Sequence, residues 1–355
     1  MSKRFLCGWA DSETKPAAYH CVARIVDRRF VLGDEEREKF RIFMRMQENF
    51  SGCRVLSYCL MSNHIHILLE VPPMAEGGIS DGELLKRLSA IWSEAAVAVL
   101  AKELGDAREA GDEALAAAIH ARHTYRMHSL SECMKTLLHR FTCWFNRTHQ
   151  RTGTLWEQRF KSVIVESGIA ARTMAAYIDL NPVRAGMVSD PAEYRWSSYG
   201  EAVGGGPKGN GKKARGGLVR ACMSHQGAGF EAEKWKDVSR IYRRAMGLAL
   251  GRKSGKAEVE KQRRSQTAAT EAEALEAKDN GTVLPDLKMA AMLRCRVRYF
   301  TDGVVIGSKE FVNEGFLAAR ERFTPKRKDG ARAMKGGGSG AKGVLWSVRD
   351  LRVRV

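Results

Sequence analysis

The stretch "CRVLSYCLMSNHIHILLEVPP", residues 53–73, contains two runs of strand-forming residues, separated by the turn-compatible tripeptide "MSN" and closed by two prolines. This order predicts an antiparallel β-hairpin. In the second strand, alternation with a period of two places His64 and His66 on one face, about 6–7 Å apart, and Ile65 and Ile67 on the other. The isoleucines then face a core, whereas the two imidazoles can hold a metal, form a polar stripe or lie at a wet edge.

The residues before the hairpin add a strand and a helix. Residues 18–32 are rich in β-branched side chains and predict a strand. Residues 34–50 carry acidic residues in their first turn and an apolar stripe, which is typical of an amphipathic helix. Strand, helix and hairpin together form the β-α-β-β start of a ferredoxin-like split sandwich. Further helices are expected over 81–104, 106–121, 129–149 and 169–181, and a further strand over 162–166. The sequence therefore predicts an α+β fold, a ferredoxin-like α/β sandwich with an antiparallel sheet.

The net charge of +18 is distributed unevenly along the chain. Residues 1–200 hold 26 of the 59 basic residues and 24 of the 41 acidic ones, a net charge of +2. The other 33 basic and 17 acidic residues give residues 201–355 a net charge of +16. This asymmetry predicts a polyanion-binding appendage on a separately folded body, with nucleic acid as the favoured partner and salt-dependent binding. A solvated basic tail is the plainer alternative.

Composition also predicts how the chain is divided. Residues 1–200 form the folded body. Residues 201–284 are predicted to be a basic, Gly-rich linker, clearest over 204–217, followed by a helical segment that begins at Trp235. Residues 285–355 are predicted to be a small appended basic domain. Within it, strand, Asp-Gly turn, strand and helix are expected over 295–323, and an edge strand over 344–355.

Several classes of protein are disfavoured. No run of about 18 apolar residues is present, so no membrane span is expected. The first residues lack the apolar core of a signal peptide. The eight cysteines are scattered without a C-x-x-C pair, which disfavours a zinc ribbon or a disulfide scaffold and is typical of free thiols in a reducing compartment. A cytoplasmic location is therefore expected.

The predicted helix over 169–181 carries Tyr177 and Asn181 at positions i and i+4, hence on one face. Together with the His-x-His strand they suggest attack on a phosphodiester. In this hypothesis His64 and His66 hold a divalent metal, Asn181 contributes an oxygen ligand, and Tyr177 attacks the phosphorus. Each residue alone has a plainer interpretation: the histidines as a polar stripe, Tyr177 as a core residue, and Asn181 as a helix-end residue before proline.

Three separated motifs carry a resemblance to a known family: "NHIHILLEVP" (63–72), "GTLWEQRFKSVIVES" (153–167) and "YIDLNPVRAGMVSDPAEYRWSSY" (177–199). In this order they resemble the single-tyrosine HUH-type transposases of the IS200-like family, and within it the REP-associated tyrosine transposases. The resemblance covers roughly residues 15–200 and implies the HUH endonuclease fold there. The extension from about residue 201 has no counterpart in minimal members of the family.

The resemblance implies an enzyme that cleaves and rejoins single-stranded DNA, often beside a small hairpin. It makes His64 and His66 the metal ligands, Tyr177 the nucleophile and Asn181 the third ligand, where many relatives carry Gln. The implied cofactor is Mg²⁺ or Mn²⁺, and the implied products are a 5′-phosphotyrosine and a free 3′-hydroxyl. Five residues of the shared motifs are candidates for binding DNA: Trp156, Arg159, Lys161, Arg184 and Arg195. Trp156 can instead pack in the core, and each cation can instead be merely solvated.

The predicted function is therefore a DNA transposase and single-strand endonuclease that acts on hairpin DNA by metal-assisted transesterification. The alternative is a domesticated protein that binds hairpin DNA without cutting it. A zinc hydrolase built on the His-x-His pair is disfavoured, because no further convergent ligands are evident in the sequence. The oligomeric state, monomer or homodimer, stays open.

Overall fold

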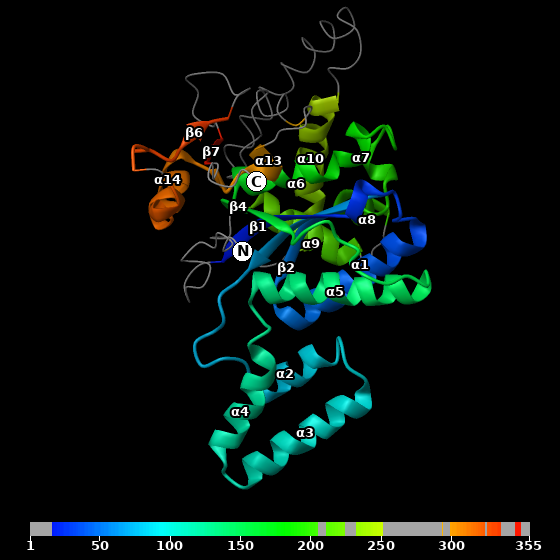
Figure 1. The fold of residues 1–355 in the computed structure, drawn as a ribbon, viewed down its shortest axis with the longest axis vertical. Coiled ribbons are helices and arrows are strands. Elements are labelled where there is room, and N and C mark those ends of the chain that lie inside the picture. Colours follow the sequence, from blue (N-terminus) through cyan, green and yellow to red (C-terminus); the bar gives the residue numbers. More distant parts are fainter. Residues whose placement is uncertain are drawn as a thin grey trace, which may run out of the picture.

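The computed structural model describes residues 16–204, 211–223, 232–250, 293, 299–323, 325–334 and 345–348. Its centre is a seven-stranded open sheet with the strand order β2-β3-β1-β4-β5-β7-β6 (Figure 1). The strands are β1 (Ala17–Arg24), β2 (Arg54–Leu60), β3 (His64–Val71), β4 (Lys161–Val165), β5 (Val305–Gly307), β6 (Arg332–Ala333) and β7 (Trp346–Val348). Neighbouring strands are antiparallel except β4 and β5, which are parallel. The predicted α+β class with a mostly antiparallel sheet is confirmed.

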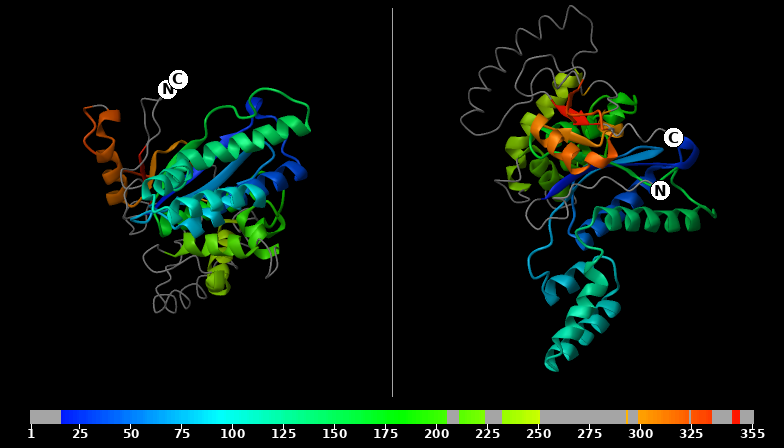
Figure 2. Two further views of the ribbon diagram at one scale, coloured as in Figure 1. Left: turned by 90° about the horizontal axis from the view of Figure 1, so that it is seen from below. Right: turned by 60° about the vertical axis from the view of Figure 1, so that its left-hand side comes forward.

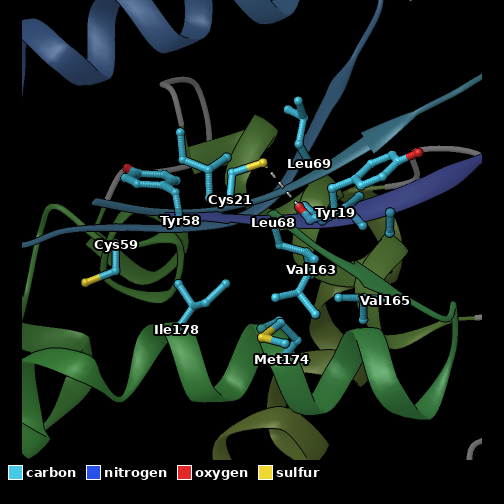
Figure 3. Packing of buried hydrophobic residues seen from close by; sticks show 14 of the residues in the cluster. Tyr19, Cys21, Tyr58, Cys59, Leu68, Leu69, Val163, Val165, Met174 and Ile178 are labelled. Carbon is cyan, nitrogen blue, oxygen red and sulfur yellow. Dashed lines mark hydrogen bonds between the residues drawn. The ribbon is translucent and has the colours of Figure 1, made fainter. Parts of the chain in front are cut away.

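The first four strands follow the ferredoxin-like order β2-β3-β1-β4. Helices α1 (Asp34–Ser51) and α5 (Leu130–Thr148) pack against each other on one face of the sheet, and α6 (Ile169–Asp179) covers the other face. Figure 3 shows Leu68 and Val163 pointing from the sheet toward Met174 and Ile178 of α6. The core is therefore split into two layers, and the side chains of each strand alternate between them.

A separate lobe of three helices is inserted between β3 and α5. Its helices are α2 (Asp81–Leu88), α3 (Glu94–Glu109) and α4 (Glu113–Thr124), and they share a second hydrophobic cluster with Phe50 of α1. The lobe projects away from the sheet (Figure 2). Two helices were predicted here; the structure has three, because Ser93 and Asp112 accept hydrogen bonds from backbone N–H groups and start new helices.

Four short 3-10 helices are η2 (Val26–Arg28), η3 (Pro191–Glu193), η4 (Ala232–Lys234) and η6 (Arg320–Arg322), and the single-turn helix α7 spans Asn181–Arg184.

Three helices beyond residue 197 pack beside α6: α8 (Ser198–Gly204), α9 (Gly211–Cys222) and α10 (Trp235–Leu250). Helix α10 confirms the helical segment predicted from Trp235. The predicted linker over 204–217 is wrong for residues 211–217, which belong to α9. A Cβ atom at Gly217 would overlap the carbonyl oxygens of Val55 and Leu56 in β2. Glycine therefore serves close packing of helix on sheet here rather than chain flexibility.

The described part of residues 285–355 extends the same sheet. The predicted strand over the first residues of 295–323 is wrong for α13 (Tyr299–Asp302), which is helical, while β5 and α14 (Lys309–Ala318) confirm the strand and helix that follow. Strand β7 confirms a strand within 344–355, but it lies between β5 and β6 rather than at the edge. The division of the chain into domains stays a prediction. Within the described residues no helix is both long and apolar enough to cross a membrane.

Candidate active site

A cavity of about 330 Å³ lies where β1 and β3 meet the C-terminal end of α6. Five residues predicted from the sequence line it: His64, His66, Tyr177, Asn181 and Arg184. The other lining residues are Arg24, Arg28, Met61, Asn63, Ala185 and Thr301. The fold thus brings both imidazoles, the tyrosine, the amide and three arginines to one place.

His64 is the first residue of β3 and is oriented by the residue before it. Its Nδ1 lies 2.7 Å from Oδ1 of Asn63. The Asn63 Nδ2 in turn donates to the backbone carbonyl of Arg28 at 3.0 Å. Because Nδ2 of Asn63 is the donor there, its Oδ1 accepts the proton of His64 Nδ1, and the lone pair of the His64 ring lies on Nε2.

His66 is buried and is held by a second histidine. Its Nδ1 lies 2.9 Å from Nε2 of His20 on β1, and His20 Nδ1 lies 2.7 Å from the carbonyl oxygen of Phe300 in α13. Burial lowers the pKa of His20 to about 4. Burial, and next the positive charges that His64 and His20 can carry, lower the pKa of His66 well below its usual value. Both rings are therefore neutral near pH 7.

The proton positions of this pair follow from the partners. A carbonyl oxygen only accepts, so His20 carries its proton on Nδ1 and has a lone pair on Nε2. His66 must then donate from Nδ1, which leaves its lone pair on Nε2. His64 and His66 thus have the same tautomer, with Nε2 as the ligand atom of each ring.

Tyr177 approaches the histidines from α6, on the other side of the cavity. Its ring is edge-on to that of His66, with ring centroids 6.4 Å apart and an interplanar angle of 90°. The guanidinium carbon of Arg184 lies 4.1 Å from the centroid of the Tyr177 ring, and Nη2 of Arg184 donates to the Tyr177 carbonyl at 2.5 Å. The Phe300 ring packs on Tyr177 at 4.6 Å between centroids. The tyrosine side chain is therefore fixed between a cation and an aromatic ring.

Asn181 is the last residue of the helix predicted over 169–181, but in the structure it lies beyond α6. Helix α6 ends at Asp179, earlier than predicted, and Asn181 begins α7. Its Nδ2 donates to the carbonyls of Tyr177 at 3.3 Å and Ile178 at 3.1 Å. The amide is thus oriented by the end of α6, with Oδ1 directed away from these carbonyls. It remains on the Tyr177 side of the cavity, as the i, i+4 spacing predicted.

These side chains fit a divalent metal ion. Two Nε2 lone pairs and one amide oxygen would occupy three positions and leave others open for oxygens of a substrate. Hydrogen bonds to Nδ1 of both rings supply the outer contacts that usually orient metal-binding histidines. In the part of the chain that the structure describes, no group of three or more His, Cys, Asp and Glu residues could hold a metal instead.

Four of the candidate DNA-binding residues lie outside the cavity. Trp156 packs against Phe40 and Phe141 in the other core layer, and its Nε1 donates to Thr142 Oγ1 at 3.0 Å. Core packing thus accounts for Trp156. The other three are Arg159, Lys161 and Arg195, and their roles in binding DNA stay predictions.

The surroundings of these three cations differ. Arg159 is exposed. Lys161 is exposed too, and it lies opposite Val22 of β1, which in turn lies opposite His66, so it is on the histidine face of the sheet. Arg195 contacts Glu38 at 3.5 Å. Arg184, in contrast, lines the cavity itself.

Sequence reasoning missed His20, Arg24 and Arg28. His20 and Arg24 lie in β1 at even spacing, so they share a face with each other. That face becomes the cavity face only through pairing with β3, in which Arg24 lies opposite His64. The sequence signal was a histidine and an arginine at even spacing in the first strand. Interpreting this signal required the register between β1 and β3.

Comparison with known proteins finds a family match for one segment of the chain. The family model described as "Transposase IS200 like" matches residues 14–93. Residues 14–93 are thus similar to the IS200-like transposases. This IS200-like segment contains β1, α1, β2 and β3, and with them His64 and His66, whereas Tyr177 lies beyond it. The family prediction is confirmed for this segment.

Among solved structures, the chain resembles a REP-associated tyrosine transposase bound to a REP hairpin. The two are 13% identical, with a TM-score of 0.36, over 57% of this chain and 84% of that one. No match was found among curated proteins.

Proposed function

We propose that this IS200-like protein is a single-strand DNA endonuclease and strand transferase that acts through a covalent tyrosine intermediate. The observation that supports it is the cavity, in which Tyr177 of α6 faces His64 and His66 of β3 across a space of about 330 Å³. A nucleophile opposite a pair of oriented imidazoles is the arrangement that metal-assisted attack on a phosphodiester requires.

The chain's own residues divide the reaction between them. Nε2 of His64, Nε2 of His66 and Oδ1 of Asn181 would hold Mg²⁺ or Mn²⁺. When bound, such an ion polarises the phosphate and offsets the charge that develops on its oxygens. Tyr177 Oη loses its proton and attacks phosphorus, the bond from phosphorus to the 3′ oxygen breaks, and that oxygen leaves as a 3′-hydroxyl after taking up a proton. The 5′-phosphotyrosine keeps the energy of the broken bond, so the reverse attack by a 3′-hydroxyl rejoins a strand.

The loop after β1 gives the cavity a rim suited to an unpaired strand. Arg24 and Arg28 line the cavity and would contact phosphates. Two residues further on, the side chain of Phe30 is 81% exposed. An exposed aromatic ring two residues along the chain from a cavity-lining arginine is suited to stacking on a base that is not paired. This supports single-stranded DNA as the substrate.

The hairpin preference and the role of the basic extension are proposals as well. The net charge of +16 beyond residue 200 would bind the phosphates of a paired stem and make the affinity depend on salt. The alternative is a protein that binds a hairpin without cutting it. The two functions share the binding surface and differ only in whether Tyr177 forms a bond to DNA.

The test is formation of a covalent adduct. Labelled hairpin oligonucleotides with single-stranded flanks, taken from DNA beside the gene, are incubated with the protein and Mn²⁺ or Mg²⁺ and separated on a denaturing gel. We expect an adduct that is lost in Tyr177→Phe, in the double variant His64→Ala/His66→Ala, and when EDTA removes the metal. The matched control is Tyr125→Phe, because Tyr125 is exposed and lies in the helical lobe.

Two results would contradict this proposal. Hairpin binding by the wild type without any adduct on either strand would favour the non-cleaving alternative. An adduct that survives Tyr177→Phe would mean that another residue is the nucleophile.

A further inference from the structure

His20 connects distant parts of the chain within the core. It is completely buried on β1, and both of its ring nitrogens are hydrogen-bonded. One bond goes to the carbonyl of Phe300, 280 residues away, and the other to His66. The two imidazole rings are nearly coplanar, with an interplanar angle of 12°. The reaction proposed above assigns His20 no role.

The two hydrogen bonds run in one direction: His66 donates to His20, and His20 donates to the Phe300 carbonyl. The Phe300 carbonyl can only accept, so it fixes the proton of His20 on Nδ1. A buried imidazole with no carboxylate partner stays neutral, since an isolated buried charge is costly. His20 Nε2 is therefore an acceptor, and His66 Nδ1 donates to it. The carbonyl at one end thus determines which nitrogen of His66 carries a lone pair at the other.

We propose that His20 is a positioning residue for His66, and that the Phe300 carbonyl, a backbone atom of the C-terminal extension, completes the outer shell of the metal site. The inference rests on the proposed function, because it concerns the metal that His66 would hold. In this proposal the C-terminal extension does more than bind polyanions, because its Phe300 carbonyl sets the tautomer and the orientation of His66.

Contacts around α13 hold this carbonyl in place. The Phe300 side chain is completely buried and packs on Tyr177. Arg184 Nη1 donates to the carbonyl of Leu293 at 2.9 Å. Just after α13, the backbone of Val304 accepts from Ile164 of β4 at 2.9 Å and donates to Val348 of β7 at 2.8 Å. Residues near α13 therefore contact both sides of the cavity, the ligand side through His20 and the nucleophile side through Tyr177.

The experiment measures Mn²⁺ binding by the full chain, using the electron paramagnetic resonance signal of unbound Mn²⁺. Three substitutions at His20 separate its two bonds. His20→Leu removes both. His20→Asn keeps an amide near the position of Nδ1 and loses the contact with His66. His20→Gln places its amide oxygen near the position of Nε2, so it can still accept from His66.

We expect His20→Leu and His20→Asn to weaken Mn²⁺ affinity about 10- to 100-fold, the usual effect of removing an outer-shell partner of a metal ligand. His20→Gln should stay within about threefold of the wild type. The matched control is His128→Gln, because Nδ1 of His128 also lies near a backbone carbonyl, that of Pro72 at 2.9 Å, and His128 is not part of the cavity lining. Thermal unfolding of each variant checks that the fold is retained.

A second readout needs no metal. In ¹⁵N spectra of histidine-labelled protein, we expect His66 to be protonated on Nδ1 in the wild type and in His20→Gln, and to lose this fixed tautomer in His20→Leu. The change shows in the ring-nitrogen shifts even where the folded state is less stable.

The outcomes separate the two proposals. If the wild type binds Mn²⁺ and folded His20→Leu and His20→Asn bind it equally well, the positioning role is overturned and the proposed function stands. If His20→Gln is as weak as His20→Leu, the acceptor role of Nε2 is overturned. If the wild type binds no Mn²⁺ at millimolar concentration, the metal site itself fails and the positioning role fails with it.

Discussion

Residues 16–200 and the described segments beyond residue 200 build one sheet, yet they contribute to the cavity in different ways. The first region supplies side chains with chemistry: two imidazoles, a phenol and an amide all come from it. The second supplies Thr301 to the lining and, behind it, the backbone carbonyls of Phe300 and Leu293 and an aromatic ring that packs on Tyr177. Chemistry in side chains requires particular residue types and leaves a pattern in the sequence, whereas any residue can supply a carbonyl.

The two regions meet at many specific contacts. Besides the bond between His20 and Phe300, three of these contacts are suited to a test by substitution. Val55 of β2 packs against Gly217 of α9, Asp179 of α6 accepts from Tyr242 of α10, and Glu166 after β4 accepts from Ser308 before α14. Each can be weakened alone, which tests how far the first region depends on the second.

The largest effect is expected from a charge placed inside the second region. Val305 is completely buried in β5, between β4 and β7. A carboxylate there has no partner, so Val305→Asp should lower the free energy of unfolding of this region on the order of 5 kcal/mol. In hydrogen exchange read by mass spectrometry, we expect peptides from α13, β5 and α14 to lose protection while peptides from β1 and β3 keep theirs.

The control for this change is Val99→Asp, because Val99 is 71% exposed in the helical lobe and should tolerate the charge. If Val305→Asp also exposes β1 and β3, the two regions unfold as one cooperative unit, and the contrast between them is one of chemistry and not of stability.

A pH-dependent contribution to stability is expected from Asp179. This carboxylate is completely buried and accepts from Tyr242 Oη at 2.7 Å and from Tyr199 N at 3.0 Å. Burial raises the pKa of Asp179 to about 7, from 3.8 in a model peptide. Between these values the folded state keeps a proton that the unfolded state has lost. The contribution of Asp179 to stability therefore falls as pH rises through this window, by at most about 1.4 kcal/mol per pH unit.

Chemical denaturation at pH 5, 6, 7, 8 and 9 checks this. We expect the free energy of unfolding of the wild type, relative to that of Asp179→Asn, to decrease steadily from pH 5 to 7 and then to level off, because above pH 7 the carboxyl is ionised in both states. A constant difference between the two proteins would show that the carboxyl titrates normally despite its burial.

The hairpin and the catalytic candidates were predictable because their signals are local. Alternation in β3 identified the face shared by His64 and His66, and helical spacing brought Asn181 to Tyr177. The ferredoxin-like fold was predicted from the order of elements, and the strand order β2-β3-β1-β4 in the structure agrees with it. In the IS200-like segment, β2 and β3 are neighbours both along the chain and in the sheet, so a local pattern was enough to predict their pairing. Strand β1, in contrast, pairs with β3 across α1 and β2.

The errors in prediction arose where distant segments decide the structure. Residues 211–217 have the composition of a linker, but Gly217 permits the close contact of α9 with β2. His20 looked like one residue of an ordinary strand, because its carbonyl partner lies 280 residues away. For Trp156 the sequence left core packing and DNA binding open, and its packing in the other core layer depends on which face of the sheet the residue meets.

A substitution at the contact between α9 and β2 should have an effect of intermediate size on the free energy of unfolding. A methyl group at Gly217 would overlap backbone atoms of Val55 and Leu56, which cannot move aside as a flexible side chain can. We expect Gly217→Ala to lower the free energy of unfolding by about 2 kcal/mol, measured by urea denaturation. Gly105→Ala is the matched control, since nothing surrounds that position in α3 and alanine should stabilise the helix there. Equal effects of the two substitutions would contradict the close packing of α9.

A smaller effect is expected where β4 meets the C-terminal strands. The Glu166 carboxylate accepts from Ser308 N at 2.6 Å and from Ser308 Oγ at 2.9 Å. A glutamine offers one acceptor oxygen instead of two, so Glu166→Gln should lower stability by about 1 kcal/mol and loosen the start of α14 in hydrogen exchange. Glu157→Gln, at an exposed position, is the control and should change neither. Unchanged protection of α14 would mean that packing alone holds it to β4.

The smallest effect on stability, and the sharpest test of the DNA path, comes from two arginines. Arg195 is exposed and its ion pair with Glu38 spans 3.5 Å, so Arg195→Ala should change the free energy of unfolding by less than about 0.5 kcal/mol.

Arg28 lines the cavity. In binding of a single-stranded oligonucleotide measured over a range of salt, Arg28→Ala should reduce the salt slope by about 1, as expected for one lost phosphate contact. If Arg195→Ala reduces it equally, the bound strand extends from the cavity to the surface of α1. If only Arg28→Ala reduces the salt slope, the path of the bound strand is confined to the cavity rim. The sequence motif containing Arg195 then serves folding rather than DNA binding.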